Sequence, residues 1–170
     1  PEGEEIYYYE SGEVREKVNR AGGQYQGERI EYYKSGVVKM KENYVDGQEQ
    51  GEFIYYYESG AVSEKGNYVG GFGLQGEYIA YYESGEVQFK SNYDMDGIKE
   101  GELEYYKSGA IASKTNYVDG KQREYISYYE SGEVYQKYNQ VDGKLQGLHM
   151  TYYESGAVKS KGNYVDNQRK

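Results

Sequence analysis

The chain has 170 residues, of which 26 are Tyr, 24 are Gly, one is His, and none is Cys or Trp. Its 20 basic and 29 acidic residues give a formal net charge of −9, which argues against a protein that binds the phosphate backbone of nucleic acids. The missing Cys excludes disulfides and thiolate metal sites, and a single His excludes a multi-histidine metal centre. No run of about 18 apolar residues occurs, so we expect no membrane-spanning segment.

A short phrase returns along the whole chain: Tyr-Tyr-Glu-Ser-Gly, with Lys in place of Glu in two copies. Its glycines are 23 to 25 residues apart, and the seven copies predict one repeat domain over residues 1–170. A second phrase, close to Asn-Tyr-Val-Asp-Gly, lies between successive copies, as at 43–47 and 116–120. The repeats are marked by the turn glycines Gly12, Gly36, Gly60, Gly85, Gly109, Gly132 and Gly156.

Each repeat offers two runs of roughly six to eight residues rich in Tyr, Val and Ile, the first ending at Ser-Gly and the second at Asp-Gly. A glycine about every 12 residues is a poor pattern for a helix, and Tyr and Val favour strands. The predicted fold is therefore all-β: an elongated antiparallel meander of hairpins, with about 14 strands in a single twisted sheet. Since no segment remains to cover the sheet, we expect it to twist across its own width or to meet a partner.

The two connectors differ in how their length varies. Every length change falls in the second connector, at 70–73, 94–97 and 120–123, which predicts an exposed loop there. The Ser-Gly connector keeps its length, and we expect a three-residue Glu-Ser-Gly turn with Gly in the left-handed conformation. Asp94-Met-Asp96-Gly97 resembles the start of a calcium loop, but it lacks the later acidic ligands, which favours a plain turn.

The three-residue turn leads to a prediction of which residues share a face. Isoleucines such as Ile6, tyrosines such as Tyr8, valines such as Val14 and tyrosines such as Tyr44 are expected on one apolar face. The opposite face is expected to carry the second Tyr of each pair with the recurring Lys and Asn, as at Lys17. We interpret the lone His149 as an exposed or sheet-face residue, because a zinc site needs three or four ligands.

The segment 76–93, Gly-Glu-Tyr-Ile-Ala-Tyr-Tyr-Glu-Ser-Gly-Glu-Val-Gln-Phe-Lys-Ser-Asn-Tyr, resembles the MORN repeat in its bacterial variant form. The resemblance covers all seven repeats. It implies an elongated antiparallel sheet without an active site that acts as a scaffold for protein or lipid contact. Bacterial proteins with this repeat are often labelled as the antitoxin of a toxin–antitoxin pair. A weaker likeness is to choline- or glycan-binding repeats of bacterial surface proteins. The location favoured is accordingly a bacterial surface or secretion rather than the cytoplasm.

The candidate binding residues are the outward Tyr row and the Lys row, because aromatic faces with ammonium and amide donors suit sugars or extended peptides. The alternative is that these tyrosines only pack the sheet and reach water, and that the lysines suppress aggregation. We expect a non-catalytic module without cofactor or metal that binds a protein or glycan; the other hypotheses are edge-to-edge self-association and an antitoxin. Nucleic acid is not an expected partner, and the charge disfavours membrane contact. The candidate residues are Tyr9, Tyr33, Tyr57, Tyr82, Tyr106, Tyr129, Tyr153, Lys41, Lys65, Lys90, Lys114 and Lys137.

Overall fold

The computed structural model describes residues 2–70 and 73–170, and these residues form strands and turns. None of them lies in a helix, so this part of the chain contains no helix long and apolar enough to cross a membrane. The fold divides into two compact parts. The N-terminal part comprises the residues up to Glu86 together with Met95–Gly97, and the C-terminal part comprises Val87–Asp94 and Ile98–Lys170.

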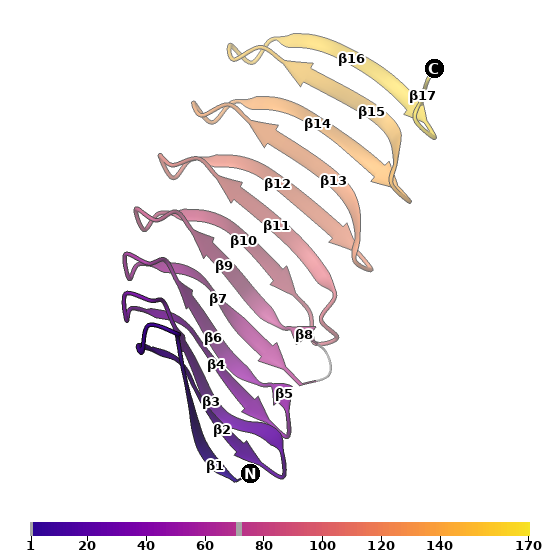
Figure 1. The fold of residues 1–170 in the computed structure, drawn as a ribbon. Coiled ribbons are helices and arrows are strands. Elements are labelled where there is room, and N and C mark those ends of the chain that lie inside the picture. The colour runs from indigo at the N-terminus through magenta and orange to yellow at the C-terminus, as the bar shows by residue number, and fades with distance from the viewer. Residues whose placement is uncertain (1, 71–72) are drawn as a thin grey trace. The chain divides into compact units, whose positions relative to one another are not determined.

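The described residues form one 17-stranded antiparallel sheet in which strands follow one another in chain order (Figure 1). The predicted open meander of hairpins is therefore confirmed. The strands of the N-terminal part are β1 (Gly3–Tyr8), β2 (Val14–Ala21), β3 (Gln24–Tyr32), β4 (Val38–Val45), β5 (Gln48–Glu49), β6 (Gly51–Tyr56), β7 (Val62–Val69), β8 (Gly73–Leu74) and β9 (Gly76–Tyr81). Those of the C-terminal part are β10 (Val87–Tyr93), β11 (Lys99–Tyr105), β12 (Ile111–Val118), β13 (Lys121–Tyr128), β14 (Val134–Val141), β15 (Lys144–Tyr152), β16 (Val158–Val165) and β17 (Gln168–Arg169).

The strand count exceeds the predicted 14 because two strands are interrupted and one short strand follows the last hairpin. Before β6, the N–H of Gln50 donates 2.8 Å to the carbonyl of Asn43, and Gly51 has a φ of 86°. Before β9, the N–H of Gln75 donates 2.9 Å to the carbonyl of Asn67, and Gly76 has a φ of 73°. Each bulge separates two residues from the rest of the strand, giving β5 and β8.

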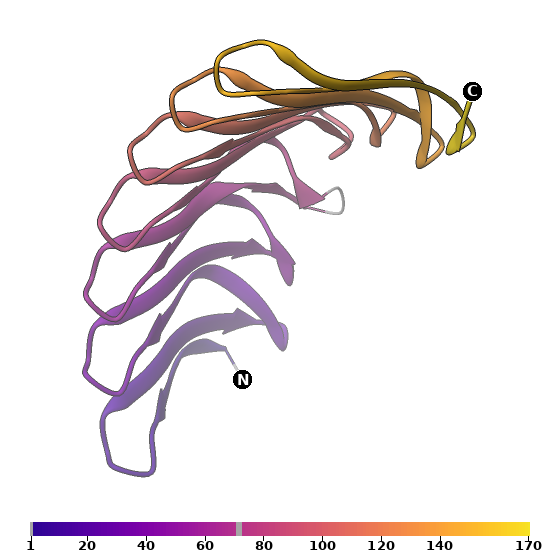
Figure 2. The same ribbon diagram turned by 90° about the horizontal axis from the view of Figure 1, so that it is seen from above.

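The Ser-Gly turn has the predicted three-residue form. In the first hairpin, the N–H of Tyr9 donates 2.8 Å to the carbonyl of Glu13, and the N–H of Gly12 donates 3.0 Å to the carbonyl of Tyr9. Gly12 has a φ of 103°, which a residue with a side chain rarely adopts. The same two hydrogen bonds close all seven of these turns, and Figure 2 shows the turns at one end of the hairpins.

The second connector is exposed, as predicted, and most of its copies are tight. Asp46 and Gly47 have φ values of 50° and 78°, the two-residue turn that suits the twist of a hairpin. The extra residue at Asp94–Gly97 gives a three-residue loop, in which the N–H of Ile98 donates 2.9 Å to the Asp94 carboxylate. The predicted plain turn is thus confirmed. The insertion predicted at 70–73 includes residues 71–72, which lie outside the described residues.

The predicted separation of isoleucine and lysine onto opposite faces is wrong. Ile6 lies directly opposite Lys17, and directly opposed residues of an antiparallel pair share a face. The cause is a bulge in each hairpin: Tyr8 is opposite Val14 while Tyr7 is opposite Glu16, so one extra residue, Arg15, is inserted. The same shift recurs in the other hairpins, as at Tyr55 and Tyr56. Because of this extra residue, the side chains of the second strand of each of these hairpins point to the face opposite the predicted one.

We call the two surfaces the repeat face and the variable face. The repeat face carries Ile6, Tyr8, Lys17 and Asn19 and their equivalents, which are nearly the same in every repeat. The variable face carries the positions of Glu5, Tyr7, Glu16, Val18 and Arg20. The residue types of the first four differ from repeat to repeat, whereas the position of Arg20 is Tyr in five of the seven repeats.

The core lies on the variable face, where Val18 and Phe53 are only 2 % exposed. On the predicted apolar face, Tyr8 is 57 % exposed and Ile6 38 %, although Ile79 is buried. Of the buried hydrophobic residues, Val18, Met40 and Phe53 are at positions that change between repeats, whereas Tyr44 and Ile79 are at positions that recur.

Candidate functional site

The predicted Tyr row lies next to the Ser-Gly turns and binds backbone. The hydroxyl of Tyr9 donates 2.6 Å to the carbonyl of Tyr32 in the next repeat, and that of Tyr129 donates 2.8 Å to the carbonyl of Tyr152. Tyr33, Tyr57 and Tyr106 donate in the same way. Tyr82 and Tyr153 hold the same sequence position in their repeats. These hydroxyls therefore join successive hairpins to one another.

The predicted Lys row lies on the repeat face, beside the first Tyr of each pair. The Nζ atoms of Lys17, Lys65 and Lys137 each lie 5.9 Å from the ring centre of a tyrosine in the following repeat: Tyr32, Tyr81 and Tyr152, respectively. This is within the range of a cation–π contact. Strand alternation places Tyr9 and its equivalents on the side opposite Lys17, so the structure does not combine the predicted Tyr and Lys rows in one surface.

Each part of the fold contains a hollow on the repeat face at the same place in the repeat. In the N-terminal part a hollow of about 190 Å³ is lined by Glu28, Lys41, Asn43, Glu52 and Ile54, together with Glu42. In the C-terminal part a hollow of about 230 Å³ is lined by Glu124, Lys137, Asn139 and Leu148, with Tyr138 beside it. The carboxylate of Glu124 accepts a hydrogen bond of 2.8 Å from the Asn116 amide.

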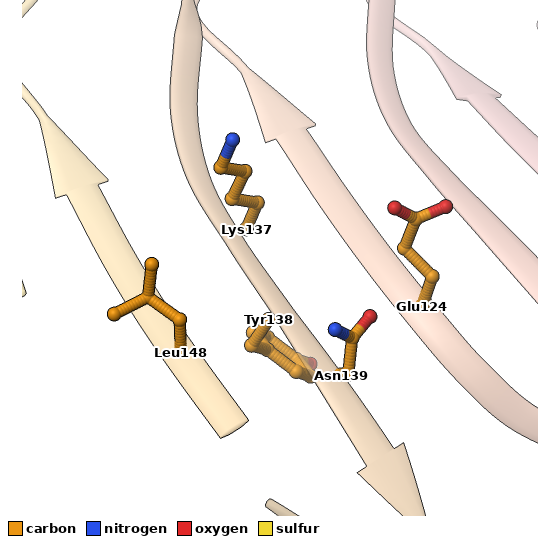
Figure 3. A pocket seen from close by; sticks show the side chains of 5 residues that line it. All are labelled: Glu124, Lys137, Tyr138, Asn139 and Leu148. Atoms are coloured by element: carbon orange, nitrogen blue, oxygen red, sulfur yellow. The ribbon is translucent and has the colours of Figure 1, made fainter. Parts of the chain in front are cut away.

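Figure 3 shows how the C-terminal hollow is formed. Lys137 and Asn139 extend from β14 on the viewer's side, between Glu124 on β13 and Leu148 on β15, whereas Tyr138 passes behind the strand. Tyr138 therefore belongs to the variable face. Both hollows are smaller than the ~300–1,000 Å³ typical of small-molecule sites. Each is suited to one side chain of a larger partner.

The variable face of the N-terminal part holds a buried ionic cluster that the sequence analysis missed. Glu42 is 5 % exposed, and its carboxylate accepts hydrogen bonds from Tyr44 (2.9 Å), Tyr55 (2.5 Å) and Arg29 (3.2 Å). Arg29 also donates 2.6 Å to Glu16. Burial, followed by the hydrogen bond to Glu42, raises the pKa of both tyrosines. For Arg29, burial is the largest single effect and lowers the pKa, but the hydrogen bond and charge of Glu16 together with Tyr44 outweigh it, and the net shift is upward.

The variable face of the C-terminal part is aromatic and mostly neutral. The rings of Tyr125 and Tyr138 stack with centres 5.0 Å apart, His149 lies 5.5 Å from Tyr138, and Tyr164 lies 5.9 Å from His149. The prediction of a sheet-face position for His149 is confirmed.

A second aromatic group on this face surrounds Lys99, whose Nζ is 5.5 to 5.7 Å from the ring centres of Phe89, Tyr93 and Tyr117. Lys99 also donates 2.9 Å to Glu102. Burial lowers its pKa, and the contact with Glu102 more than compensates, so that the pKa is raised overall.

The sequence contained one signal that could have revealed the two faces. Ile6, Lys17 and Asn19 have equivalents in nearly every repeat, whereas Glu5, Glu16 and Val18 do not. Residues that recur together are expected to share a surface. Grouping by hydrophobicity instead separated lysine from isoleucine, although a Lys stem packs readily on apolar neighbours.

Comparison with known proteins supports the repeat pattern. The family model for the MORN repeat variant matches residues 1–20, 25–46, 49–69, 74–95 and 145–166, more than half of the chain. No curated protein matches the chain. The five matched segments each contain one Tyr-Tyr turn and the strands on either side of it. The chain belongs to the MORN repeat variant family.

Proposed function

We propose that the chain is a non-catalytic repeat module that binds a protein partner through the repeat face. MORN repeats are in general protein- or membrane-binding repeat modules. The observation that carries the proposal is the hollow that recurs at the same repeat position in both parts, bordered by Lys41 in one and Lys137 in the other. A repeated hollow fits a partner that contacts several repeats at once.

The chemistry of the repeat face favours a protein side-chain surface. The repeat face offers ammonium groups beside aromatic rings, as at Lys65 and Lys137, together with amides such as Asn43 and apolar residues such as Ile54. Carboxylates border the N-terminal hollow on both sides, at Glu28 and Glu52, while Leu148 replaces one of them in the C-terminal hollow. Mixed charges of this kind determine register and partner choice more than affinity.

The repetition supports the non-catalytic part of the proposal. An active site needs a nucleophile, acid or base that differs from its neighbours in environment. On the repeat face the lysines and asparagines recur as rows, and no carboxylate pair is set apart from the others.

Site-specific photo-crosslinking tests the proposal. A benzoylphenylalanine residue at Lys65 or Lys137 would be on the repeat face, and the same residue at the adjacent Glu64 or Gln136 would be on the variable face. In cells that make the protein natively, we expect one protein adduct from positions 65 and 137, suppressed by the added substitution Lys41→Glu.

The control positions decide the outcome. Equal adducts from positions 64 and 136, or none from 65 and 137, would contradict the proposal. An adduct between two copies of the chain would identify self-association instead, and an adduct with a toxin would give the module an antitoxin role.

A further inference from the structure

We propose that the variable face of the C-terminal part, over β13–β16, binds an uncharged oligosaccharide. This surface is on the opposite side of the sheet from the repeat face, so the proposal is independent of the protein partner proposed above. It depends on two adjacent rows of side chains, one polar and one aromatic.

The polar row runs across β12–β16 without interruption. Ser113 lies opposite Ser127, Ser127 opposite Gln136, Gln136 opposite Thr151, and Thr151 opposite Ser160. The hydroxyls of Thr151 and Ser160 share a hydrogen bond of 2.6 Å at the exposed end of the row. Ser113 and Ser127 are buried, Gln136 and Thr151 are half-buried, and Ser160 is exposed. The open end therefore presents hydroxyl and amide groups one strand apart.

The aromatic row is one step along the same strands and consists of Tyr125, Tyr138 and His149. Gly162 is opposite His149, and the ring of Tyr164, two residues farther along β16, lies over this glycine. These four aromatic residues are half-buried, and within the described residues the Nε2 atom of His149 is buried without a hydrogen-bond partner. Gly162 makes room for the last ring, because a Cβ there would lie 3.0 Å from a Tyr164 ring carbon. The ring planes of Tyr138 and His149 are inclined at 74°, so the row presents both ring faces and ring edges.

Charge separates this surface from the same rows in the N-terminal part. There the rows contain Glu16, Arg29 and Glu42, which pair with one another. Between Ser127 and Ser160 the polar row of the described C-terminal part contains no charged side chain, although 29 % of all residues are charged. A neutral polar row favours a neutral ligand, and the guanidinium of Arg169, beside Tyr164 at the end of the aromatic row, can donate to its hydroxyls.

A sugar chain fits this combination better than a peptide does. Pyranose rings have an apolar C–H face, which packs on aromatic rings, and hydroxyls at the rim, which bond to hydroxyl and amide side chains. A peptide usually joins a sheet at its edge through backbone hydrogen bonds, whereas these rows lie on the face. The ligand class assigned is thus a linear oligosaccharide of uncharged sugars.

The full chain can be tested with a panel of cellohexaose, chitohexaose, xylohexaose, mannohexaose and maltohexaose in amide NMR titrations. We expect at least one to shift resonances of β13–β16 while those of β1–β7 remain unchanged. Saturation by none of the five would overturn the proposal, and so would shifts confined to repeat-face residues. Binding of a neutral decapeptide at β13–β16, with no sugar bound, would assign the surface to a peptide and overturn it as well.

Matched variants locate the site. Tyr138→Ala should weaken binding about tenfold, because it removes an aromatic contact from the centre of the row. Val158→Ala changes an exposed residue of β16 that is paired with Tyr152 on the other face and lines neither hollow, and it should leave the affinity within twofold. Gln136→Lys leaves the aromatic rings unchanged and adds a charge to the polar row, so it should also weaken binding of a neutral sugar. Undiminished affinity in both Tyr138→Ala and Gln136→Lys would reject the site, even if the sugar binds elsewhere.

Discussion

The hydroxyl of Tyr33 donates a hydrogen bond of 2.7 Å to the carbonyl oxygen of Tyr56 in the following repeat. Equivalent bonds from Tyr9 and Tyr57 continue the series along the Ser-Gly turns of the N-terminal part. At the other end of the hairpins, the Gln26 side chain accepts a bond of 3.0 Å from the N–H of Asp46, and Gln50 accepts one of 2.8 Å from Gly70. Successive hairpins are therefore joined at both ends by side chain to backbone bonds, in addition to the strand pairing between them.

The first prediction concerns this series. Tyr33→Phe should lower the free energy of unfolding by about 0.5–1.5 kcal/mol, because it removes one hydrogen bond and keeps the ring. Urea unfolding at pH 7 measures the change. Tyr56→Phe is the matched control, since the Tyr56 hydroxyl makes no hydrogen bond within the described residues, and it should cost less than 0.5 kcal/mol. Equal losses in the two variants would show that the bond contributes nothing specific.

The turns and the meander could be predicted from sequence because they depend on local conformation. Gly12 and its equivalents need a positive φ, and Asp46-Gly47 matches a known hairpin turn, so each connector fixes the path of its own strands. Repetition at constant spacing then gave the neighbour order, and no long-range information was needed.

The faces were predicted wrongly because they depend on a bulge without a local sequence signal, and only the recurrence of residues between repeats pointed to them. Val14 and Arg15 occupy the place of one residue opposite Tyr8, and neither is a glycine. A single inserted residue reverses every side chain beyond it. The predicted binding surface was wrong for the same reason. Tyr9, the second Tyr of its pair, was grouped with the lysines, whereas the structure places Tyr32, the first Tyr of the next pair, beside Lys17. The neutral rows around Tyr138 were missed because their residues do not recur.

The second prediction concerns alkaline pH. The pKa of Tyr44 and Tyr55 is raised by burial and by the Glu42 carboxylate, so the folded state favours their protonated forms. Their contribution to stability is complete below the unfolded pKa of about 10 and decreases as the pH rises above it. We expect the difference in unfolding free energy between wild type and Tyr55→Phe to be about 1.5–3 kcal/mol at pH 8 and to shrink above pH 10.

Urea unfolding at intervals from pH 8 to pH 11.5 would follow that difference, and comparison with the variant removes the common effect of lysine titration. A constant difference for Tyr55→Phe over the whole range would contradict the assignment.

The third prediction compares a buried and an exposed ion pair. Arg29 is 21 % exposed and bonds to Glu42, whose side chain is 4 % exposed. Arg29→Met should lower the free energy of unfolding by about 2–3 kcal/mol, because it removes the guanidinium that pairs with the Glu16 and Glu42 carboxylates. This is somewhat less than the cost of breaking a fully buried pair. Lys39→Met removes a pair of similar length, 2.8 Å to Glu31, from a site where Lys39 is 45 % exposed, and should cost at most about 1 kcal/mol. Thermal and urea unfolding both measure these differences, and a similar cost for the two variants would show that burial does not strengthen the Arg29 cluster.

The last prediction concerns two strand glycines without positive φ, Gly66 and Gly101. A Cβ at Gly66 would lie 2.7 and 2.8 Å from two ring carbons of Phe53, which is almost completely buried and stacks on Tyr68 at 4.5 Å. Gly66→Ala should therefore force the ring to move and cost about 1–3 kcal/mol. At Gly101 the nearest atom to a Cβ is the carbonyl oxygen of Thr115 at 3.9 Å, so Gly101→Ala should be neutral or stabilise by up to about 1 kcal/mol through the reduced entropy of the unfolded chain. Gly66 is needed because it lets an aromatic ring lie flat on the neighbouring strand, and restoring stability to Gly66→Ala by adding Phe53→Leu would confirm that the clash with this ring is the cause.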